Sequence, residues 1–150
     1  MKIFSKYFTT LFGIGLISFA PGTFGSLIAI FIWYAFVNVF SIFYFIVLFL
    51  FILSVSFYFT DIYLENYRKK DPSEVVIDEF LGQSIPLLFM VNFNMYEVLI
   101  AFVTFRFFDI YKIYPINKME DIRGSYGVIL DDIVAGIYSL IVIMLYKIFV

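Results

Sequence analysis

Two polar interruptions divide the long apolar stretch near the start of the chain. No charged side chain occurs from Tyr7 to Thr60, a run of 54 residues. As one helix this run would be about 81 Å long, whereas the hydrocarbon core of a bilayer is about 30 Å thick. The turn formers at 20–22 and the polar residues at 38–41 therefore predict two membrane-spanning helices, near residues 23–40 and 42–60.

The remaining apolar segments predict shorter helices and one further span. Asn92, Asn94 and Glu97 interrupt the middle of 80–105, which favours a hairpin of two short helices over one long helix. A last span is predicted at about 128–149. In the first 13 residues, polar and apolar side chains recur on opposite sides at helical spacing, which is typical of a helix lying in the membrane interface. A first spanning helix is the alternative for this segment.

Charged residues concentrate in two segments, 61–79 and 106–132, which hold eighteen of the 22 charges. A hairpin between them returns both segments to the same side of the membrane. Their Lys and Arg residues predict that this side is cytoplasmic, because basic residues favour cytoplasmic loops. We therefore expect an all-α, multi-pass membrane bundle with short or broken helices, one domain over 1–150, and a site at its cytoplasmic face.

Composition narrows the chemistry. With 63% hydrophobic and 15% charged residues, the chain does not resemble a water-soluble domain. A net charge of −2 gives no basic excess for binding a nucleic acid, so no nucleic-acid partner is expected. The chain has no Cys and no His. Any reaction here must use carboxylates, hydroxyls, lysine or a bound metal.

The first acidic group lies at 71–79. Asp71 and Pro72, followed by Glu74, predict a helix start at which Asp71, Glu74 and Asp78 share one face. Carboxylates this close repel one another, so Mg²⁺ is their natural counter-charge. The alternative is that Asp71 and Glu74 only cap the helix. Asp78 and Glu79 enter an apolar helix, where an ionised group is costly unless it is paired or bound to metal.

The second group is Arg106, Asp109 and Lys112, spaced to share one stripe at the end of an apolar helix. In the functional interpretation Arg106 and Lys112 hold a phosphate and Asp109 completes a metal shell. The alternative is a salt bridge at the membrane surface, worth well under about 1 kcal/mol.

The third group is the adjacent pair Asp131 and Asp132 in the first turns of the last helix. Neighbouring side chains diverge by about 100° around a helix, so one carboxylate is expected to face a metal and the other a donor or second metal. Ala135 and Gly136 are predicted to let another helix approach closely. Gly124 and Gly127 are predicted to form turns in the preceding loop.

The fourth group is Ala20-Pro21-Gly22-Thr23-Phe24-Gly25-Ser26, a turn that leads into a helix. The amides of this helix N-terminus, with the hydroxyls of Thr23 and Ser26, predict a phosphate-binding nest. Pro-Gly turns and Thr or Ser caps are also common between membrane helices, so the pattern alone is weak.

Together these groups resemble the phosphatidylglycerophosphatase A family. The matching segments are Ala-Pro-Gly-Thr-Phe-Gly-Ser at 20–26, Asp-Pro-Ser-Glu-Val-Val-Ile-Asp-Glu-Phe-Leu-Gly at 71–82, Arg-Phe-Phe-Asp-Ile-Tyr-Lys-Ile-Tyr-Pro-Ile at 106–116, and Gly-Val-Ile-Leu-Asp-Asp-Ile-Val-Ala-Gly at 127–136. Ile113 departs from the proline usual in the family, and the histidine that some relatives carry near Gly124 is absent. The resemblance implies Mg²⁺-dependent removal of the terminal phosphate of phosphatidylglycerophosphate, a lipid substrate, in the bacterial inner membrane.

These residues receive roles in that reaction. We expect the acids Asp78, Glu79, Asp131 and Asp132 to be catalytic, with Asp78 and Asp131, together with Glu79 or Asp109, binding one or two Mg²⁺. Arg106, Lys112, Thr23 and Ser26 are expected to bind the substrate phosphate, with Asp71, Glu74, Gly22 and Gly25 in support. Water activated by Mg²⁺ is favoured as nucleophile over an aspartyl-phosphate, because no Asp-x-Asp signature is present.

Two other function classes remain open at this point. Intramembrane acids also form ion sites in transporters of ions or solutes, although transporter acids lie near mid-membrane and often accompany inverted repeats. A non-catalytic helper subunit would explain the hydrophobicity but not three acidic clusters on one side.

Overall fold

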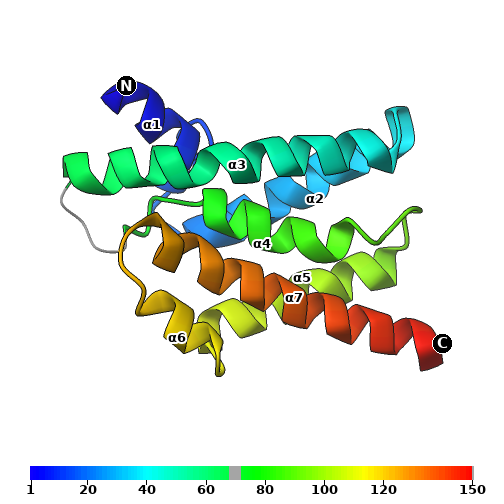
Figure 1. The fold of residues 1–150 in the computed structure, drawn as a ribbon. Helices are drawn as coiled ribbons and strands as arrows, with labels where there is room; N and C mark the ends of the chain where they lie inside the picture. Colours follow the sequence, from blue (N-terminus) through cyan, green and yellow to red (C-terminus); the bar gives the residue numbers. More distant parts are fainter. Residues whose placement is uncertain (68–71, 150) are drawn as a thin grey trace.

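The helices of the chain lie roughly side by side along one direction in the computed structural model, which describes residues 1–67 and 72–149 (Figure 1). No β-strand occurs in these two ranges. The elements are α1 (Lys2–Thr9), the 3₁₀ turn η1 (Ile14–Leu16), α2 (Pro21–Val39), α3 (Ile42–Tyr67), α4 (Ile77–Leu87), α5 (Met95–Tyr111), α6 (Ile116–Glu120) and α7 (Ser125–Phe149).

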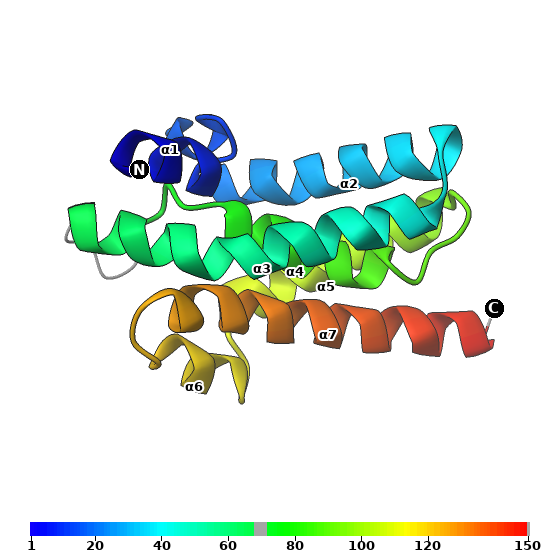
Figure 2. The same cartoon turned by 45° about the horizontal axis from the view of Figure 1, so that its top comes forward.

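Three helices, α2, α3 and α7, are long and apolar enough to cross a membrane. Only 17% of the most apolar part of α3 is buried inside the protein. Such an exposed apolar surface on a long helix suits contact with lipid rather than water. Figure 2 shows these three helices running the length of the bundle. The spans predicted near 23–40, 42–60 and 128–149 are confirmed as helices, and α3 continues seven residues beyond its predicted end.

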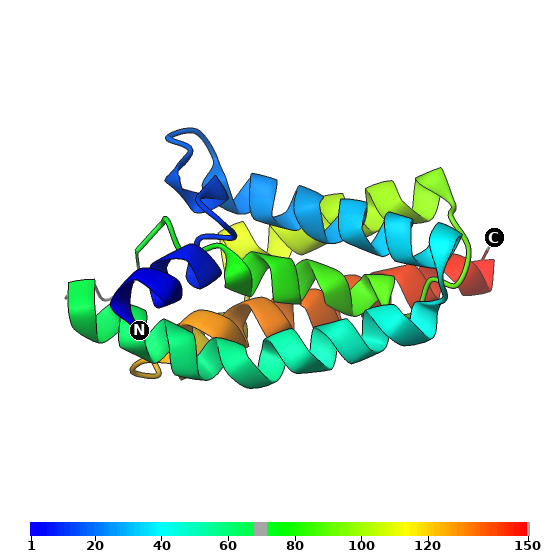
Figure 3. The same ribbon diagram turned by 90° about the horizontal axis from the view of Figure 1, so that it is seen from above.

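The short helix α4 lies at the centre of the bundle, with α2, α3, α5 and α7 around it (Figure 3). All of its eleven residues except Glu79 are buried. At its far end the chain turns back through 88–94 into α5, where the Asn94 side chain accepts a hydrogen bond from the amide of Tyr96. The predicted hairpin is therefore confirmed, although α5, with 17 residues, is longer than the short helix expected.

Glycines let α4 approach its neighbours closely. A Cβ atom on Gly136 of α7 would lie 2.2 Å from the backbone oxygen of Gly82 in α4. Ala135 beside it is also buried. The predicted packing role of these two small residues is confirmed. Gly124 has a φ of +77°, as a turn glycine does, whereas Gly127 lies inside the first turns of α7 and not in the loop.

The N-terminal half of the acidic segment does not form the predicted helix start. The segment 72–76 contains a turn and no helix, and α4 begins only at Ile77. The amide of Val76 donates to the carbonyl of Thr9 at 2.9 Å, so this segment is held by α1 instead of continuing a helix. Glu74 therefore does not share a helix face with Asp78, and Asp71 lies outside the described residues.

The first helix is too short to span a bilayer. Its eight residues would be about 12 Å long at the usual helical rise. The buried side chains of α1 are Ser5 and Thr9, while Ile3, Phe4 and Tyr7 are exposed. The spanning alternative for this segment is wrong, and the exposed apolar side chains fit a helix lying in the interface.

Candidate active site

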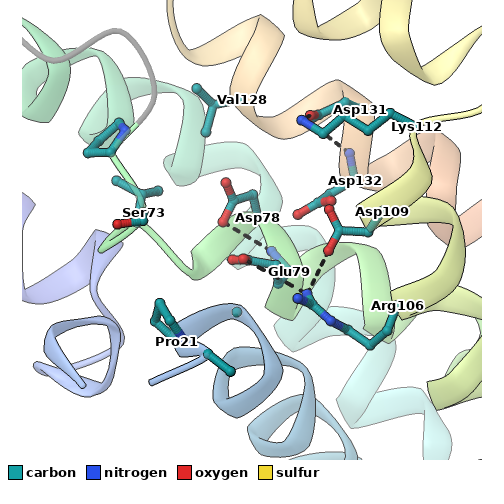
Figure 4. Close-up of a pocket in the computed structure, with 14 residues that line it drawn as sticks. Pro21, Ser73, Asp78, Glu79, Arg106, Asp109, Lys112, Val128, Asp131 and Asp132 are labelled. Carbon is teal, nitrogen blue, oxygen red and sulfur yellow. Dashed lines mark hydrogen bonds and ion pairs between the residues drawn. The ribbon is translucent and has the colours of Figure 1, made fainter. Parts of the chain in front are cut away.

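A pocket of about 250 Å³ opens at the end of the bundle where α2, α4 and α7 begin and α5 ends. Figure 4 shows its side chains converging from these four helices. Its charged lining consists of Asp78, Glu79, Arg106, Asp109, Lys112, Asp131 and Asp132. The sequence therefore identified every charged residue of this pocket, although they come from three separate segments.

Three carboxylates form a tight cluster within the pocket. One oxygen from each of Asp78, Glu79 and Asp132 lies within 4.8 Å of the other two. Asp78 is 7% exposed and Asp132 is 3% exposed. The Oε2 atom of Glu79 is buried and has no hydrogen-bond partner among the described residues. Oxygen ligands at such spacing are what hard divalent cations such as Mg²⁺ bind, so these residues fit a metal ion.

The crowding changes the pKa values of the two acids in α4, Asp78 and Glu79. Helix α4 is not one of the three candidate membrane spans. Burial raises the pKa of Glu79 to about 7. Burial also raises the pKa of Asp78 well above its ordinary value, and the charge of Glu79 adds to the rise. A raised carboxyl pKa means that the ionised form lacks compensating positive charge. The protein's own side chains therefore supply less positive charge than these carboxylates need when they are ionised, and a bound cation would supply the rest.

Arg106 lies between two of the pocket's acids. Its Nη1 atom is 2.6 Å from Oδ2 of Asp109 and 4.0 Å from Oε1 of Glu79. Each of these three side chains is about one-sixth exposed or less. Arg106 thus neutralises part of the acidic lining, and Asp109 faces this guanidinium rather than joining the cluster of three carboxylates.

Lys112 does not share the predicted stripe with Arg106 and Asp109. Helix α5 ends at Tyr111, and Lys112 adopts a left-handed conformation with φ +43° and ψ +53°. Its Nζ atom lies 2.9 Å from Oδ2 of Asp131 and 3.1 Å from Oε1 of Glu120. Burial alone would lower the pKa of Lys112, but its bonds to these carboxylates outweigh burial and raise it. Lys112 therefore carries a full positive charge at the pocket wall.

The neighbouring acids of α7 face two different partners, as the sequence predicted. Asp132 turns toward Asp78 and Glu79, and Asp131 turns toward Lys112. The sequence hypothesis had Asp131 among the metal ligands, whereas the structure gathers Asp132 with the α4 acids. Helical spacing indicates that two adjacent side chains diverge, but it does not say which of them faces α4.

The hydroxyls predicted for a phosphate nest do not reach the pocket. Neither Thr23 nor Ser26 lines it, and the Ser26 hydroxyl donates to the backbone oxygen of Gly22 at 3.0 Å. Serine inside a helix commonly makes this bond to the preceding turn. From the same turn, Ala20, Pro21 and Gly22 line the pocket through their backbone and apolar atoms.

The two glycines of α2 face the start of α4. A Cβ atom on Gly22 would lie 1.9 Å from Oε1 of Glu79 and 3.0 Å from Nη1 of Arg106. A Cβ atom on Gly25 would lie 2.9 Å from the backbone oxygen of Val76. Both glycines therefore support the site by making room for it. Glu74 lies outside the pocket lining and accepts a hydrogen bond from the Tyr63 hydroxyl at 2.9 Å.

Sequence reasoning missed two polar contributors to the site. Ser73 lines the pocket, and Glu120 of the short helix α6 contacts Lys112. Ser73 lies within the matching segment 71–82, which was a signal for it. Glu120 had none, because its position depends on how the segment after Lys112 folds back.

The charges of the pocket indicate what it can bind. Five carboxylates and two basic side chains leave an excess of three negative charges when all are ionised. A phosphate group would be repelled by this lining unless a divalent cation were present. One divalent cation would reduce this excess to a single negative charge, and two would make the pocket net positive. The pocket therefore suits a phosphorylated substrate only with metal bound.

Comparison with known proteins finds similarity to lipid phosphatases over most of the chain. A protein-family model described as phosphatidylglycerophosphatase A matches residues 7–147. A Bacteroides thetaiotaomicron protein named putative phosphatidylinositol-3-phosphatase is 42% identical over 89% of this chain and 87% of its own length. Proteins named phosphatidylglycerophosphatase A from Haemophilus influenzae and Escherichia coli are 32% and 35% identical, over 88% and 85% of this chain and 82% and 74% of their own lengths. No solved structure matches the chain at a significant level.

Proposed function

Because the chain belongs to the phosphatidylglycerophosphatase A family, we propose that its pocket removes the terminal phosphate of phosphatidylglycerophosphate with the help of Mg²⁺. Because it belongs to this family, the chain is a phosphoric monoester hydrolase. The observation that supports this substrate class best is the pocket itself, which gathers seven charged side chains at one end of three long apolar helices. That placement suits a substrate whose phosphate is polar and whose acyl chains stay in the bilayer.

Asp78, Glu79 and Asp132 would hold the metal ion. When bound, Mg²⁺ supplies positive charge and Lewis acidity at the phosphoryl oxygens. Lys112 and Arg106 lie at the pocket wall beside this cluster, where they bind the other phosphoryl oxygens.

The remaining acids position these bases and handle protons. Asp131 fixes Lys112 at 2.9 Å, and Asp109 fixes Arg106 at 2.6 Å. In the hydrolysis a water oxygen attacks phosphorus and gives up a proton to a carboxylate, the bond from phosphorus to the lipid oxygen breaks, and the lipid oxygen takes up that proton and leaves as an alcohol. Asp131 and Asp109 line the pocket outside the cluster of three carboxylates, so either one can accept the water's proton.

The same chemistry suits a second lipid phosphomonoester. The relative named putative phosphatidylinositol-3-phosphatase has a higher identity to this chain than the two named phosphatidylglycerophosphatase A. A phosphate on an inositol ring presents the same phosphoryl group to the pocket. Phosphatidylinositol 3-phosphate is therefore the second candidate substrate.

Phosphate release by the detergent-purified protein tests this function. The substrates are phosphatidylglycerophosphate, phosphatidylinositol 3-phosphate and phosphatidic acid, each in Mg²⁺ and in EDTA. We expect Mg²⁺-dependent release that is fastest from phosphatidylglycerophosphate and is abolished by Asp78→Asn. Faster release from the inositol lipid would make phosphatidylinositol 3-phosphate the preferred substrate and phosphatidylglycerophosphate the second. No release from any of them by folded protein would overturn the proposal, and transport would then be tested.

We also propose that the protein crosses the bacterial inner membrane several times and that its pocket opens to the cytoplasm. Among the described basic residues, only Lys147 lies near the far end of the bundle, where it pairs with Glu97 at 2.9 Å. The positive-inside tendency supports this orientation.

The absence of Cys allows a clean test of orientation by single cysteines. Asn92 lies in the turn between α4 and α5. In whole cells whose outer membrane alone has been made permeable, a membrane-impermeant maleimide should label Asn92→Cys. It should label Lys118→Cys only after the inner membrane is opened. The reverse labelling would contradict the orientation.

A further inference from the structure

The segment between α1 and α2 exposes large apolar side chains next to the pocket. In residues 11–19, here called the apolar loop, Phe12 is 85% exposed and Phe19 is 81% exposed. Leu16 and Ile17 are exposed as well. Figure 3 shows this segment projecting from the bundle at the end where α4 and α7 begin. Four exposed apolar side chains on a short loop form a patch that favours an apolar partner.

Seven of the nine amides in the apolar loop are hydrogen-bonded within the chain. The amides of residues 11–17 all donate hydrogen bonds to carbonyls within residues 7–14, for example Phe12 to Tyr7 at 2.7 Å and Gly15 to Thr10 at 2.9 Å. An amide that is already hydrogen-bonded within the chain loses little when an apolar molecule covers it, whereas an unpaired amide would lose its water. Leu11 and Phe12 also have positive φ values, +45° and +57°, which bulky residues seldom adopt. The loop therefore begins with two strained residues, and the ring of the second is exposed.

The apolar loop is attached to two walls of the pocket. Phe19 leads directly into Ala20 and Pro21, which line the pocket. On the other side, a Cβ atom on Gly15 would lie 1.9 Å from the backbone oxygen of Glu74, between the pocket residues Ser73 and Val75. The apolar loop is therefore continuous with the pocket wall at Ala20 and packed against it at Glu74.

We propose that the apolar loop binds the acyl chains of the substrate lipid while its phosphate occupies the pocket. This inference rests on the proposed function, since it assumes a lipid phosphomonoester as substrate. Membrane anchoring alone does not require the loop, because α2, α3 and α7 already provide long apolar surfaces. The loop contacts the pocket wall at Gly15 and continues into it after Phe19, which connects it to the pocket.

Acyl-chain length provides the test. We would measure kcat/KM in detergent micelles for phosphatidylglycerophosphate with two hexanoyl or two oleoyl chains. The wild type is compared with the double variant Phe12→Asn and Phe19→Asn, because Asn tolerates positive φ and neither ring is buried. The matched control is Phe40→Asn with Phe43→Asn, two rings at the α2–α3 turn that are 66% and 62% exposed. Thermal unfolding confirms that each variant is folded.

We expect the wild type to prefer the long-chain lipid, and the loop variant to lose roughly tenfold or more on that lipid alone. The control should retain wild-type values on both. The inference is overturned if the wild type shows no preference, if the loop variant is unchanged, or if it loses equally on both lipids, which would mean that the loop only supports the pocket wall. A wild type inactive on both lipids would instead refute the proposed function.

Discussion

Gly22 offers a direct test of Glu79, because the substitution Gly22→Ala places a methyl group where the carboxylate lies. The added Cβ would be 1.9 Å from Oε1 of Glu79 and 2.8 Å from its Cδ. Ordinary van der Waals contact begins at 3.4 Å, so the carboxylate must retreat by about 1.5 Å. The end of a Glu side chain can rotate away, whereas the helix backbone stays in place.

This displacement exceeds what a metal site tolerates. Ligand distances in such sites vary by only about 0.2 Å, and displacing reacting groups by about 1 Å can cost about 100-fold in rate. We therefore expect Gly22→Ala to weaken Mg²⁺ binding and to lower kcat/KM by roughly 10- to 100-fold. The melting temperature should change little, because alanine favours a helix over glycine by roughly 0.5–1 kcal/mol and this gain offsets the cost of displacing the Glu79 side chain.

Gly25→Ala is the matched control one helical turn further along. Its Cβ would lie 2.9 Å from the backbone oxygen of Val76 but 3.6 Å from Glu79, so α2 must move and the carboxylate is not pushed directly. This variant should lose about 1–3 kcal/mol of stability. Isothermal titration with Mg²⁺, phosphate release and thermal unfolding measure these effects. Wild-type metal affinity and turnover in Gly22→Ala would refute the assignment of Glu79 to the metal site.

Three further predictions concern protonation, charge and packing. Because the pKa of Glu79 is raised to about 7, a proton competes with the metal below that pH. The affinity for Mg²⁺ should therefore be roughly tenfold weaker at pH 6 than at pH 8. Without metal, the free energy of unfolding contributed by protonated Glu79 should be lost as the pH rises from about 4.5 through 7. An affinity independent of pH would contradict this. Lys112→Met should lower kcat/KM at least about tenfold with the fold intact, while Lys118→Met, at an exposed position, should not; equal effects would exclude a direct role for Lys112. Gly136→Ala should lower the melting temperature, because its Cβ would meet a backbone oxygen of α4 at 2.2 Å, a clash worth about 1–3 kcal/mol. An unchanged melting temperature would show that α4 and α7 are less tightly packed than described.

The helices were predictable because apolar length and charge placement determine them directly. A charge-free run too long for one crossing had to be divided, and Pro21 and the polar residues near Asn38 marked where. The start of α4 was not predictable in this way. Asp71, Pro72 and Glu74 form a good local helix signal, but the hydrogen bond from the Val76 amide to the Thr9 carbonyl is a tertiary contact that no local pattern reveals.

The composition of the pocket was predictable and its internal pairing was not. Acids and bases at the ends of apolar helices had to be satisfied somewhere, which identified the charged lining. The partner of each depends on rotation about the helices and on where they end. Helix α5 ends at Tyr111, so Lys112 turns toward Asp131 and Glu120 instead of Asp109. That leaves Asp132, rather than its neighbour, beside the acids of α4.

Asp78, Glu79 and Asp132 are proposed to hold a divalent cation on which phosphate release depends. The most direct measurement compares Asp132→Asn with Asp131→Asn in Mg²⁺ titration and in phosphate release from the lipid substrate. We predict that Asp132→Asn loses both, whereas Asp131→Asn still binds Mg²⁺ and loses turnover through Lys112. Wild-type Mg²⁺ binding in Asp132→Asn, or undiminished phosphate release by the wild type in EDTA, would contradict the claim.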